Sequence, residues 1–325
     1  MSTPDLPTTT LRLAPYSPAH EAEWNDFVDR AANGTFLLRR SFMDYHQDRF
    51  ADASLLVWQR EVLVAVFVAG QYRQTPEPAV LVAHPGLTYG GLIHLPELKY
   101  ADLAAIYPAV LEQVRAAGYR QLVIKPVPRV FCRFPNEASL FWLTSQGFAL
   151  RNREQNSVID LLQPLRISKG RKDNVRKARK QGIEVAVSGE LAAFWDILTD
   201  NLWATHQVRP VHSLAEISLL QERHPANVVL YTACLRGEVV AGVLLFVDEA
   251  RGFVHTQYIS ANETGKATGA VDAVLLTILE HYHQRVPRFS FGISTVRGVV
   301  NFGLLAHKEG FGATVELMDT YAKEL

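Results

Sequence analysis

Apolar positions repeat along the chain with the period of a helix in some segments and with that of a strand in others. In the first half this pattern predicts helices over 19–32, 41–50 and 101–117, a helix that ends at 145–148, and strands over 54–58, 62–69, 79–83 and 121–125. In the second half it predicts helices over 192–204, 214–223 and 270–285, a helix that ends at 308–312, and strands over 228–235, 239–247, 252–259 and 288–292. Each half therefore has the same order of elements.

The two halves also end alike. A glycine and a phenylalanine follow the last helix at Gly147-Phe148 and again at Gly310-Phe311, an offset of 163 residues. Such self-similarity indicates an internal duplication. A strand-like run over 157–162 is followed by Pro164, so we expect two domains, 1–165 and 166–325.

Composition narrows the class of protein. The 325 residues include 33 basic and 33 acidic side chains, with 48% hydrophobic and 20% charged residues, which is typical of a globular protein. The two cysteines, Cys132 and Cys234, lie far apart and exclude both a disulfide framework and a cysteine-rich zinc site. The first ten residues lack the apolar core of a secretory signal, and the longest apolar runs are strand-sized. We therefore expect a cytoplasmic protein without membrane insertion.

One segment of this neutral chain has a strong positive charge. Residues 166–180 carry a net charge of +7, from a single acid and eight basic residues: Arg166, Lys169, Arg171, Lys172, Arg176, Lys177, Arg179 and Lys180. Val175 and Ala178 are spaced as on one helix face, and Gly182 follows, so we predict a short helix with a narrow apolar seam. Such a segment is either a solvated connector or a surface for tRNA or another polyanion.

The predicted order of elements is that of the GNAT acyltransferase fold. This order is two helices, an antiparallel meander, a glycine-bearing loop before a long helix, and then strand, helix and strand. The chain resembles the FemAB/FemX-like branch of that superfamily in three features. These are the two copies of this order of elements, the basic run Arg171–Gly182 and the C-terminal run Gly303–Gly312. The resemblance covers the chain from about residue 24 onward. It implies an α/β (α+β) fold of two tandem GNAT-like domains, each a mixed, mostly antiparallel sheet flanked by helices.

The resemblance implies acyl transfer to an amine. FemAB-like proteins transfer amino acids from charged tRNA to a cell-wall peptide precursor, whereas other GNAT proteins use acyl-CoA. This chain has His307 where members commonly have phenylalanine, and it lacks the sustained heptads of a coiled-coil arm. These departures favour an acyl-CoA donor over aminoacyl-tRNA.

Lys308 is the first catalytic candidate. It aligns with the family lysine that stabilises the negative charge that develops on the acyl oxygen, and an ammonium does this by electrostatics. The alternative is a solvated lysine in the last turn of a helix, where the helix dipole favours a cation.

The segment 262–270 is the candidate for donor binding. Gly265 and Gly269 would let backbone N–H groups approach the pyrophosphate of CoA at a helix N-terminus, and Lys266 would add charge. A plain turn between a strand and a helix has the same composition.

His255 and Tyr258 lie in the strand before that loop. His255 has a suitable pKa to deprotonate the incoming ammonium, and Tyr258 could serve as general acid. Strand alternation places His255 with Gln257 on one face and Thr256 with Tyr258 on the other. Structural roles within the sheet are the alternative for both.

Four further residues are candidates for acceptor binding. Arg297 and Asn301 follow a strand at the place where this fold opens its cleft, and Tyr89 and Lys125 hold the corresponding place in the first domain. The first loop lacks a basic residue, so we interpret domain one as the acceptor-side or scaffold copy and domain two as the donor-binding, catalytic copy. Arg39 and Arg40 are expected to be solvated.

Other chemistries lack their motifs. No His-Glu-x-x-His pattern indicates a metal, and no Gly-x-Ser-x-Gly elbow indicates a serine hydrolase. The sequence therefore predicts an N-acyltransferase that acts on a small polar amine, with a non-catalytic RNA- or polyanion-binding protein as the alternative.

Overall fold

A computed structural model describes residues 10–74, 79–83, 85–296 and 298–325. The chain forms two compact units. The first contains the residues up to Arg153 together with Leu317–Leu325, and the second contains Glu154–Glu316. Each unit has its own hydrophobic core, and each is described by itself below.

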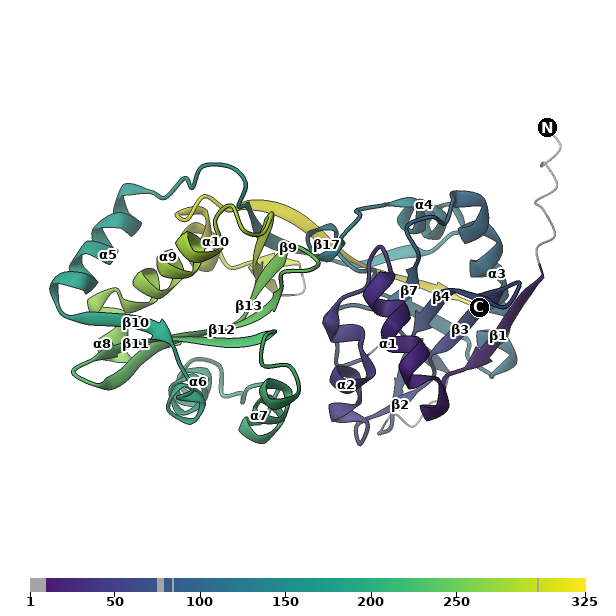
Figure 1. The fold of residues 1–325 in the computed structure, drawn as a ribbon, viewed down its shortest axis with the longest axis horizontal. Coiled ribbons are helices and arrows are strands. Elements are labelled where there is room, and N and C mark those ends of the chain that lie inside the picture. The colour runs from purple at the N-terminus through teal and green to yellow at the C-terminus, as the bar shows by residue number, and fades with distance from the viewer. Residues whose placement is uncertain (1–9, 75–78, 84, 297) are drawn as a thin grey trace. The chain divides into compact units, whose positions relative to one another are not determined.

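The first unit combines helices with strands (Figure 1). Its helices are α1 (Glu21–Arg30), α2 (Arg40–Met43), α3 (Tyr100–Ala116) and α4 (Ala138–Ser145), with 3-10 turns at Pro18–His20, Phe36–Leu38, Asp44–His46 and Arg129–Phe131. Its strands are β1 (Leu11–Pro15), β2 (Phe50–Asp52), β3 (Leu55–Gln59), β4 (Val62–Val68), β5 (Gly70–Tyr72), β6 (Val80–Val82), β7 (Gly91–His94) and β8 (Gln121–Ile124).

The second unit has longer strands than the first. Its helices are α5 (Lys169–Lys180), α6 (Leu191–His206), α7 (Leu214–Arg223), α8 (Glu263–Thr268), α9 (Ala270–Tyr282) and α10 (Phe302–Glu309). Its strands are β10 (Ile183–Val187), β11 (Val228–Leu235), β12 (Glu238–Asp248), β13 (Phe253–Ala261), β14 (Arg288–Ile293), β15 (Thr295–Val296) and β16 (Val299–Val300). Two strands, β9 (Ala149–Asp160) and β17 (Thr314–Glu324), contribute residues to both units.

Both units build mostly antiparallel sheets with one parallel pair in the described register. In the first unit β1, β3, β4 and β7 follow one another antiparallel, and β2, β5, β6, β8 and β17 form a second row in which only β6 and β8 are parallel. In the second unit the order is β10, β11, β12, β13, β14 and β9, and only β13 and β14 are parallel. This arrangement confirms the predicted fold class.

The last strand of each half completes the sheet of the other unit. Residues 156–160 of β9 pair with β14, while residues 321–324 of β17 pair with β8. The structure therefore divides the chain inside β9 and inside β17, rather than once after residue 165 as the sequence predicted. Sequence order did not reveal this exchange, because strand patterning does not specify the partner strand.

Helices cover both faces of the second sheet (Figure 1). Val243, Leu245 and Val247 of β12 lie in the core with α9, since alternate residues of a strand face the same side. On the opposite face Gly242 lies under Phe194 of α6, where a Cβ atom would approach the ring to 2.5 Å. Glycine is therefore needed here for α6 to pack on the sheet.

Most predicted elements are confirmed with shifts of a few residues at their ends. The basic segment forms α5, whose buried residues are Val175 and Ala178, and Gly182 after it has a φ of +82°. The sequence missed eight strands. Seven are short, namely β1, β2, β5, β7, β10, β15 and β16, and the eighth is the long C-terminal strand β17. The expected loop over 262–270 is instead the helix α8 followed directly by α9.

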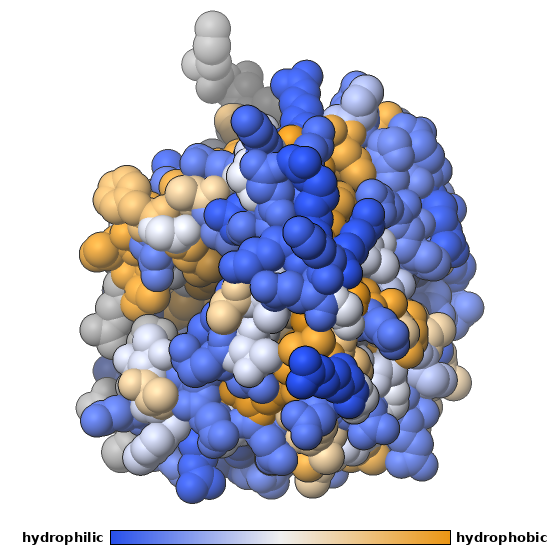
Figure 2. Space-filling model, turned by 90° about the vertical axis from the view of Figure 1, so that its left-hand side faces the viewer, coloured by the Kyte–Doolittle hydropathy of each residue, from blue (hydrophilic) through white to orange (hydrophobic). Residues whose placement is uncertain are grey.

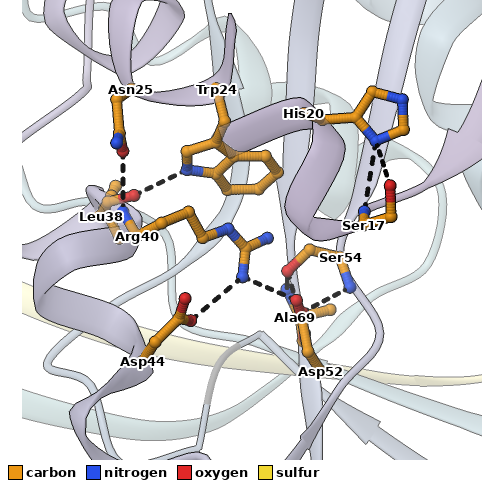
Figure 3. A network of polar contacts seen from close by, with 10 residues as sticks. All are labelled: Ser17, His20, Trp24, Asn25, Leu38, Arg40, Asp44, Asp52, Ser54 and Ala69. Carbon is orange, nitrogen blue, oxygen red and sulfur yellow. Dashed lines mark hydrogen bonds and ion pairs between the residues drawn. The ribbon is translucent and has the colours of Figure 1, made fainter. Parts of the chain in front are cut away.

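A buried arginine stabilises the first unit (Figure 3). Arg40 is 1% exposed, and its guanidinium carbon lies 3.3 Å from the ring centre of Tyr16 and 3.9 Å from that of Trp24. Its Nη1 atom lies 2.6 Å from Asp52 Oδ2 and 3.7 Å from Asp44 Oδ1. The prediction that this arginine is solvated is therefore wrong, since stacking and carboxylate partners compensate its burial.

Candidate functional site

The site begins where the parallel strands β13 and β14 separate. Their ladder contains three residue pairs and ends at His255 opposite Ser290. Beyond this pair β13 continues to Ala261 and β14 to Ile293, past the end of the ladder described between them. In open sheets, ligands bind beside the carboxyl ends of parallel strands, so this is the first place to examine for chemistry.

A β-bulge changes which side chains face one another here. Leu244 of β12 pairs with Tyr258, but the next residue, Leu245, pairs with Thr256, so Gln257 is the extra residue. Val254 before the bulge and Ile259 after it both face the core with α9, although they are five residues apart. The bulge has therefore displaced by one residue the alternation of β13 side chains between the two faces of the sheet.

Tyr258 therefore lies on the α6 side of the sheet. Its ring packs edge-on against Trp195 of α6, at 5.2 Å between centroids. His255 lies on the same side, because its partner Ser290 is flanked by Phe289 and Phe291, which both point into the α9 core. The prediction that His255 and Tyr258 lie on opposite faces is wrong, because simple alternation ignores a bulge.

A hydrogen-bonded row crosses three neighbouring strands at this point. Nδ1 of His255 on β13 lies 3.0 Å from Oγ of Ser290 on β14. The Ser290 hydroxyl donates to Oδ1 of Asn156 on β9, over 2.9 Å. Ser290 and Asn156 are fully buried, so water does not compete for these contacts.

Lys308 reaches the same region from α10. Its side chain is 2% exposed, and its Nζ atom donates to the carbonyl oxygens of Gly292 at 2.9 Å and Ile293 at 2.7 Å. Burial lowers the pKa of Lys308 to about 8, so the ammonium form still predominates near neutral pH. The alternative of a solvated lysine is therefore wrong.

Gly292 joins the lysine to the histidine row. Its N–H donates to Ser290 Oγ at 3.2 Å, and its carbonyl accepts from Lys308. Its φ of +75° is a conformation that favours glycine, and a Cβ atom there would lie 3.4 Å from Cε1 of His255. Two predicted catalytic residues thus come together around one left-handed glycine.

Tyr258 has a partner of its own. Its hydroxyl lies 2.7 Å from Nδ1 of His212, in the segment between α6 and α7. Burial raises the pKa of Tyr258, and the hydrogen bond from the backbone N–H of His212 offsets only part of this effect. The hydroxyl is therefore protonated near neutral pH and can donate a proton or a hydrogen bond.

An acidic residue anchors the helices behind the site. Asp272, in the first turn of α9, accepts from Arg171 Nη1 and from Asn174 Nδ2 of α5, at 2.9 and 2.7 Å. Its other oxygen lies 2.9 Å from Nε2 of His307, the residue before Lys308. Asp272 is buried and its lowered pKa keeps it negative, so it is an internal partner for α5 and α10 in the first turn of α9.

Packing explains the two glycines of the predicted donor loop. A Cβ atom on Gly265 would lie 2.2 Å from the carbonyl oxygen of Val240, and one on Gly269 would lie 2.9 Å from that of Asn174. Lys266 is half-exposed, and its Nζ atom contacts Asn201 and Glu263, each at 2.8 Å. Lys266 is therefore the member of this group whose charge faces solvent.

Two acceptor candidates follow β14. Asn301 is the N-cap of α10, where its side chain accepts from Leu304 N–H at 3.0 Å. Capping accounts for this asparagine. Arg297 lies outside the described residues.

The two candidates of the first unit lie close to each other. The N–H of Gly90 donates to the carbonyl of Lys125 at 2.9 Å, where β7 and β8 belong to different rows of strands. The Tyr89 hydroxyl is buried and donates to Thr35 at 3.0 Å, so packing accounts for this tyrosine.

The basic helix α5 divides its charges between the interior and solvent. Arg171 contacts Asp272, and Lys177 donates to the carbonyl of Ala267 at the end of α8. Five further basic residues of α5 are exposed. Four of them repeat every three or four positions along one face, namely Lys169, Lys172, Arg176 and Arg179, and the fifth is Lys180. The end of the second unit that carries α5 is mostly hydrophilic (Figure 2).

Ser290 and Asn156 were missed at the sequence level. A polar residue between Phe289 and Phe291 was the available signal for Ser290, and the polar start of the strand over 154–160 was that for Asn156. In the described ranges no group of three or more His, Cys, Asp or Glu side chains is placed to hold a metal ion. Nor does any described helix have both the length and the apolar character needed to cross a bilayer.

Comparison with known structures identifies the fold. FemX superposes with a TM-score of 0.70 at 12% identity over 97% of both chains. L-PGS from Bacillus licheniformis gives 0.58 at 12% identity, over 94% of this chain and 91% of that one. A tandem GNAT protein from the clavulanic acid biosynthesis pathway gives 0.55 at 10% identity, over 97% and 98%. No family model and no curated protein matches the chain. The protein therefore has the FemAB-like tandem GNAT fold.

Proposed function

We propose that the protein is an N-acyltransferase whose chemistry takes place in the second unit. The observation that carries this proposal is that β13 and β14 separate beside Gly292, around which His255 and Lys308 meet. Acyl transfer needs a base for the ammonium and a positive group for the oxyanion, and this site has a residue of each type.

The donor that we favour is an acyl-CoA thioester. The tandem GNAT protein of the clavulanic acid pathway, whose structure was determined without AcCoA, supports this choice by its fold. Lys266 is the residue that we expect to contact the CoA phosphates, because its ammonium faces solvent beside α8. Aminoacyl-tRNA is the alternative donor.

The acceptor that we propose is a small polar amine of the chemical class found among cell-envelope precursors. Lys125 of the first unit stays a sequence prediction for acceptor binding, and so does Arg297, which lies outside the described residues. Because acyl-CoA and charged tRNA are made inside cells, the same proposal assigns the protein to the cytoplasm.

A donor and acceptor screen tests this function. The purified chain is incubated with a panel of amines and either acyl-CoA or aminoacyl-tRNA, and amine-dependent release of thiol or of deacylated tRNA is measured. The Lys308→Met variant is the control for release without catalysis. Turnover with one donor class that this variant loses supports the proposal, and no amine-dependent release from any donor contradicts it.

The second candidate function is non-catalytic binding of RNA or another polyanion. The row of exposed basic residues on α5 favours it, since phosphate contacts release counterions and bind without sequence preference. The double variant Lys172→Glu and Arg176→Glu should abolish binding of tRNA and its steep dependence on salt if α5 is the binding surface. Unchanged tRNA binding, or no binding by the natural chain, excludes this candidate.

A further inference from the structure

We propose that Ser290 and Asn156 are positioning residues that hold the His255 imidazole with its proton on Nδ1, so that Nε2 accepts the proton of the amine substrate. This inference rests on the proposed acyl transfer, which it deepens by assigning the direction of proton transfer. It concerns two residues that the sequence did not single out.

The three side chains come from three neighbouring strands. His255 lies opposite Ser290 at the last pair of the parallel ladder. On the other side of β14, Val158 of β9 lies opposite Ser290, and Asn156 lies opposite Ile293 beyond an irregularity in the register. Each strand therefore contributes one polar side chain at the point where the sheet opens. Because the three strands belong to one sheet, the row is held by backbone ladders on both sides of Ser290.

The single hydroxyl proton of Ser290 determines which groups donate and which accept in this row of hydrogen bonds. A serine hydroxyl has one proton to donate, and Ser290 donates it to Oδ1 of Asn156, which can only accept. The oxygen of Ser290 therefore accepts from its other neighbours, which are the N–H of Gly292 and Nδ1 of His255. Nδ1 must carry the proton of the neutral imidazole, and Nε2 then carries the lone pair.

Burial makes this arrangement specific. Asn156 and Ser290 are both fully buried, and Nδ2 of Asn156 has no hydrogen-bond partner among the described residues. A buried amide with an unused donor carries a desolvation cost, and such costs are retained where a polar group serves a function. The acceptor oxygen of Asn156 is the part of the side chain that the row uses.

The proposed step balances as follows. Nε2 of His255 takes a proton from the substrate ammonium, and the neutral amine forms a C–N bond to the acyl carbon. The C–S bond of the thioester then breaks with its electron pair on sulfur, and the imidazolium returns its proton to the thiolate. The new amide nitrogen loses its remaining extra proton to water. In this proposal the ammonium of Lys308, which donates to the carbonyl of Gly292, stabilises the negative charge that develops on the acyl oxygen.

Nitrogen-15 NMR of the chain labelled at histidine tests the tautomer directly. We expect the neutral His255 ring to carry its proton on Nδ1 in the natural protein. In Asn156→Asp, which keeps an acceptor oxygen, the same tautomer should persist. In Asn156→Leu the Ser290 hydroxyl is released to donate to His255, so the proton should move to Nε2. A natural protein with the proton on Nε2, or an unchanged tautomer in Asn156→Leu, overturns the proposal.

Kinetics provide the second readout. Ser290→Ala should lower kcat about 10- to 100-fold and leave KM for the donor within about twofold, because a misoriented base affects proton transfer rather than donor binding. Ser290→Thr, which keeps the hydroxyl, should restore most of the activity. The matched control is Ser157→Ala, another buried serine, which contacts Ser294 instead of the histidine row.

The two proposals fail in different ways. If Ser157→Ala lowers kcat as much as Ser290→Ala does, the row is only structural and the positioning role is wrong. If no donor gives acyl transfer, the proposed function is wrong, while the tautomer measurement still decides whether Asn156 and Ser290 orient the imidazole.

Discussion

The imidazole Nε2 of His307 lies 2.9 Å from Oδ1 of Asp272, and this contact joins the helix that carries Lys308 to the first turn of α9. Arg171 and Asn174 of α5 donate to the same carboxylate. Burial alone raises the pKa of Asp272, but the hydrogen bonds from His307 and Asn174 and the charge of Arg171 outweigh it and hold this pKa below its ordinary value. The histidine that departs from the FemAB-like motif thus has a structural partner in this chain.

Replacement of Asp272 by asparagine should destabilise the second unit by about 3 kcal/mol, because Arg171 then loses the partner of its partly buried charge. The lowered pKa adds a pH dependence. Its stabilisation is fully present above the ordinary carboxyl pKa of 3.8 and is lost as pH falls through the lower value of the folded state.

Thermal unfolding at several pH values checks this prediction. The control is Glu249→Gln, which removes an exposed partner of Arg285 and should change stability by less than about 1 kcal/mol. Equal midpoints for Asp272→Asn and the natural chain would show that the carboxylate does not hold the three helices together.

Turnover should depend on the charge of Lys308. Removing one group that stabilises an oxyanion commonly costs about 2.7 to 4 kcal/mol, which corresponds to about a 100- to 1000-fold loss of kcat. We therefore expect Lys308→Ala to lose activity on this scale while its circular dichroism spectrum stays that of the natural chain. Full turnover in the folded variant removes Lys308 from the mechanism.

The buried lysine also predicts a dependence of stability on pH. Its folded-state pKa of about 8 lies below the ordinary 10.5, so between these values the unfolded chain binds more protons than the folded one. Stability should therefore rise with pH across this window, and below about pH 8 the full cost of burying the charge is present.

Lys308→Met separates this effect from other titrations. The variant should lack the rise that Lys308 contributes, and denaturant midpoints from pH 7 to 10.5 measure the difference. The same pKa predicts that oxyanion stabilisation declines above about pH 8, where the ammonium is lost. Identical pH profiles for the two chains contradict both statements.

Gly265→Ala should destabilise the protein whether or not donor is present. A Cβ atom 2.2 Å from the carbonyl of Val240 forces β12 and α8 apart. Gly189→Ala is the matched control, because no atom lies within 4 Å of its added Cβ, and we expect a change within about 1 kcal/mol. Melting temperatures without donor are compared. If the Gly265→Ala variant is stable but binds the donor more weakly, Gly265 contributes to donor binding rather than to packing.

Arg40→Lys should destabilise the first unit by about 3 kcal/mol. Lysine keeps the charge but cannot stack a planar group between Tyr16 and Trp24 while it contacts Asp52. Arg30→Lys, in an exposed pair with Asp26, should change stability by less than about 0.5 kcal/mol. Urea unfolding followed by tryptophan fluorescence distinguishes the two, and similar losses for both would mean that stacking contributes little.

The sequence by itself determined the longer helices and strands and the likeness of the two halves. Helical and strand periods are local properties, so α9, β11, β12 and β14 were predicted within a few residues of their bounds. The apolar seam of α5 at Val175 and Ala178 followed from spacing alone. The family motif singled out Lys308, and the position of His255 before the loop singled out the histidine.

Only the tertiary structure decided how these residues meet. The bulge at Gln257 turned Tyr258 to the side of His255, because one extra residue in a strand reverses every later side chain. The exchange of β9 and β17 brought Asn156 of the first half beside Ser290 of the second, a pairing separated by more than a hundred residues. Periodicity specifies the face of a strand but not its neighbour, and so hydrogen bonds between distant strands were decided by packing of the whole sheet.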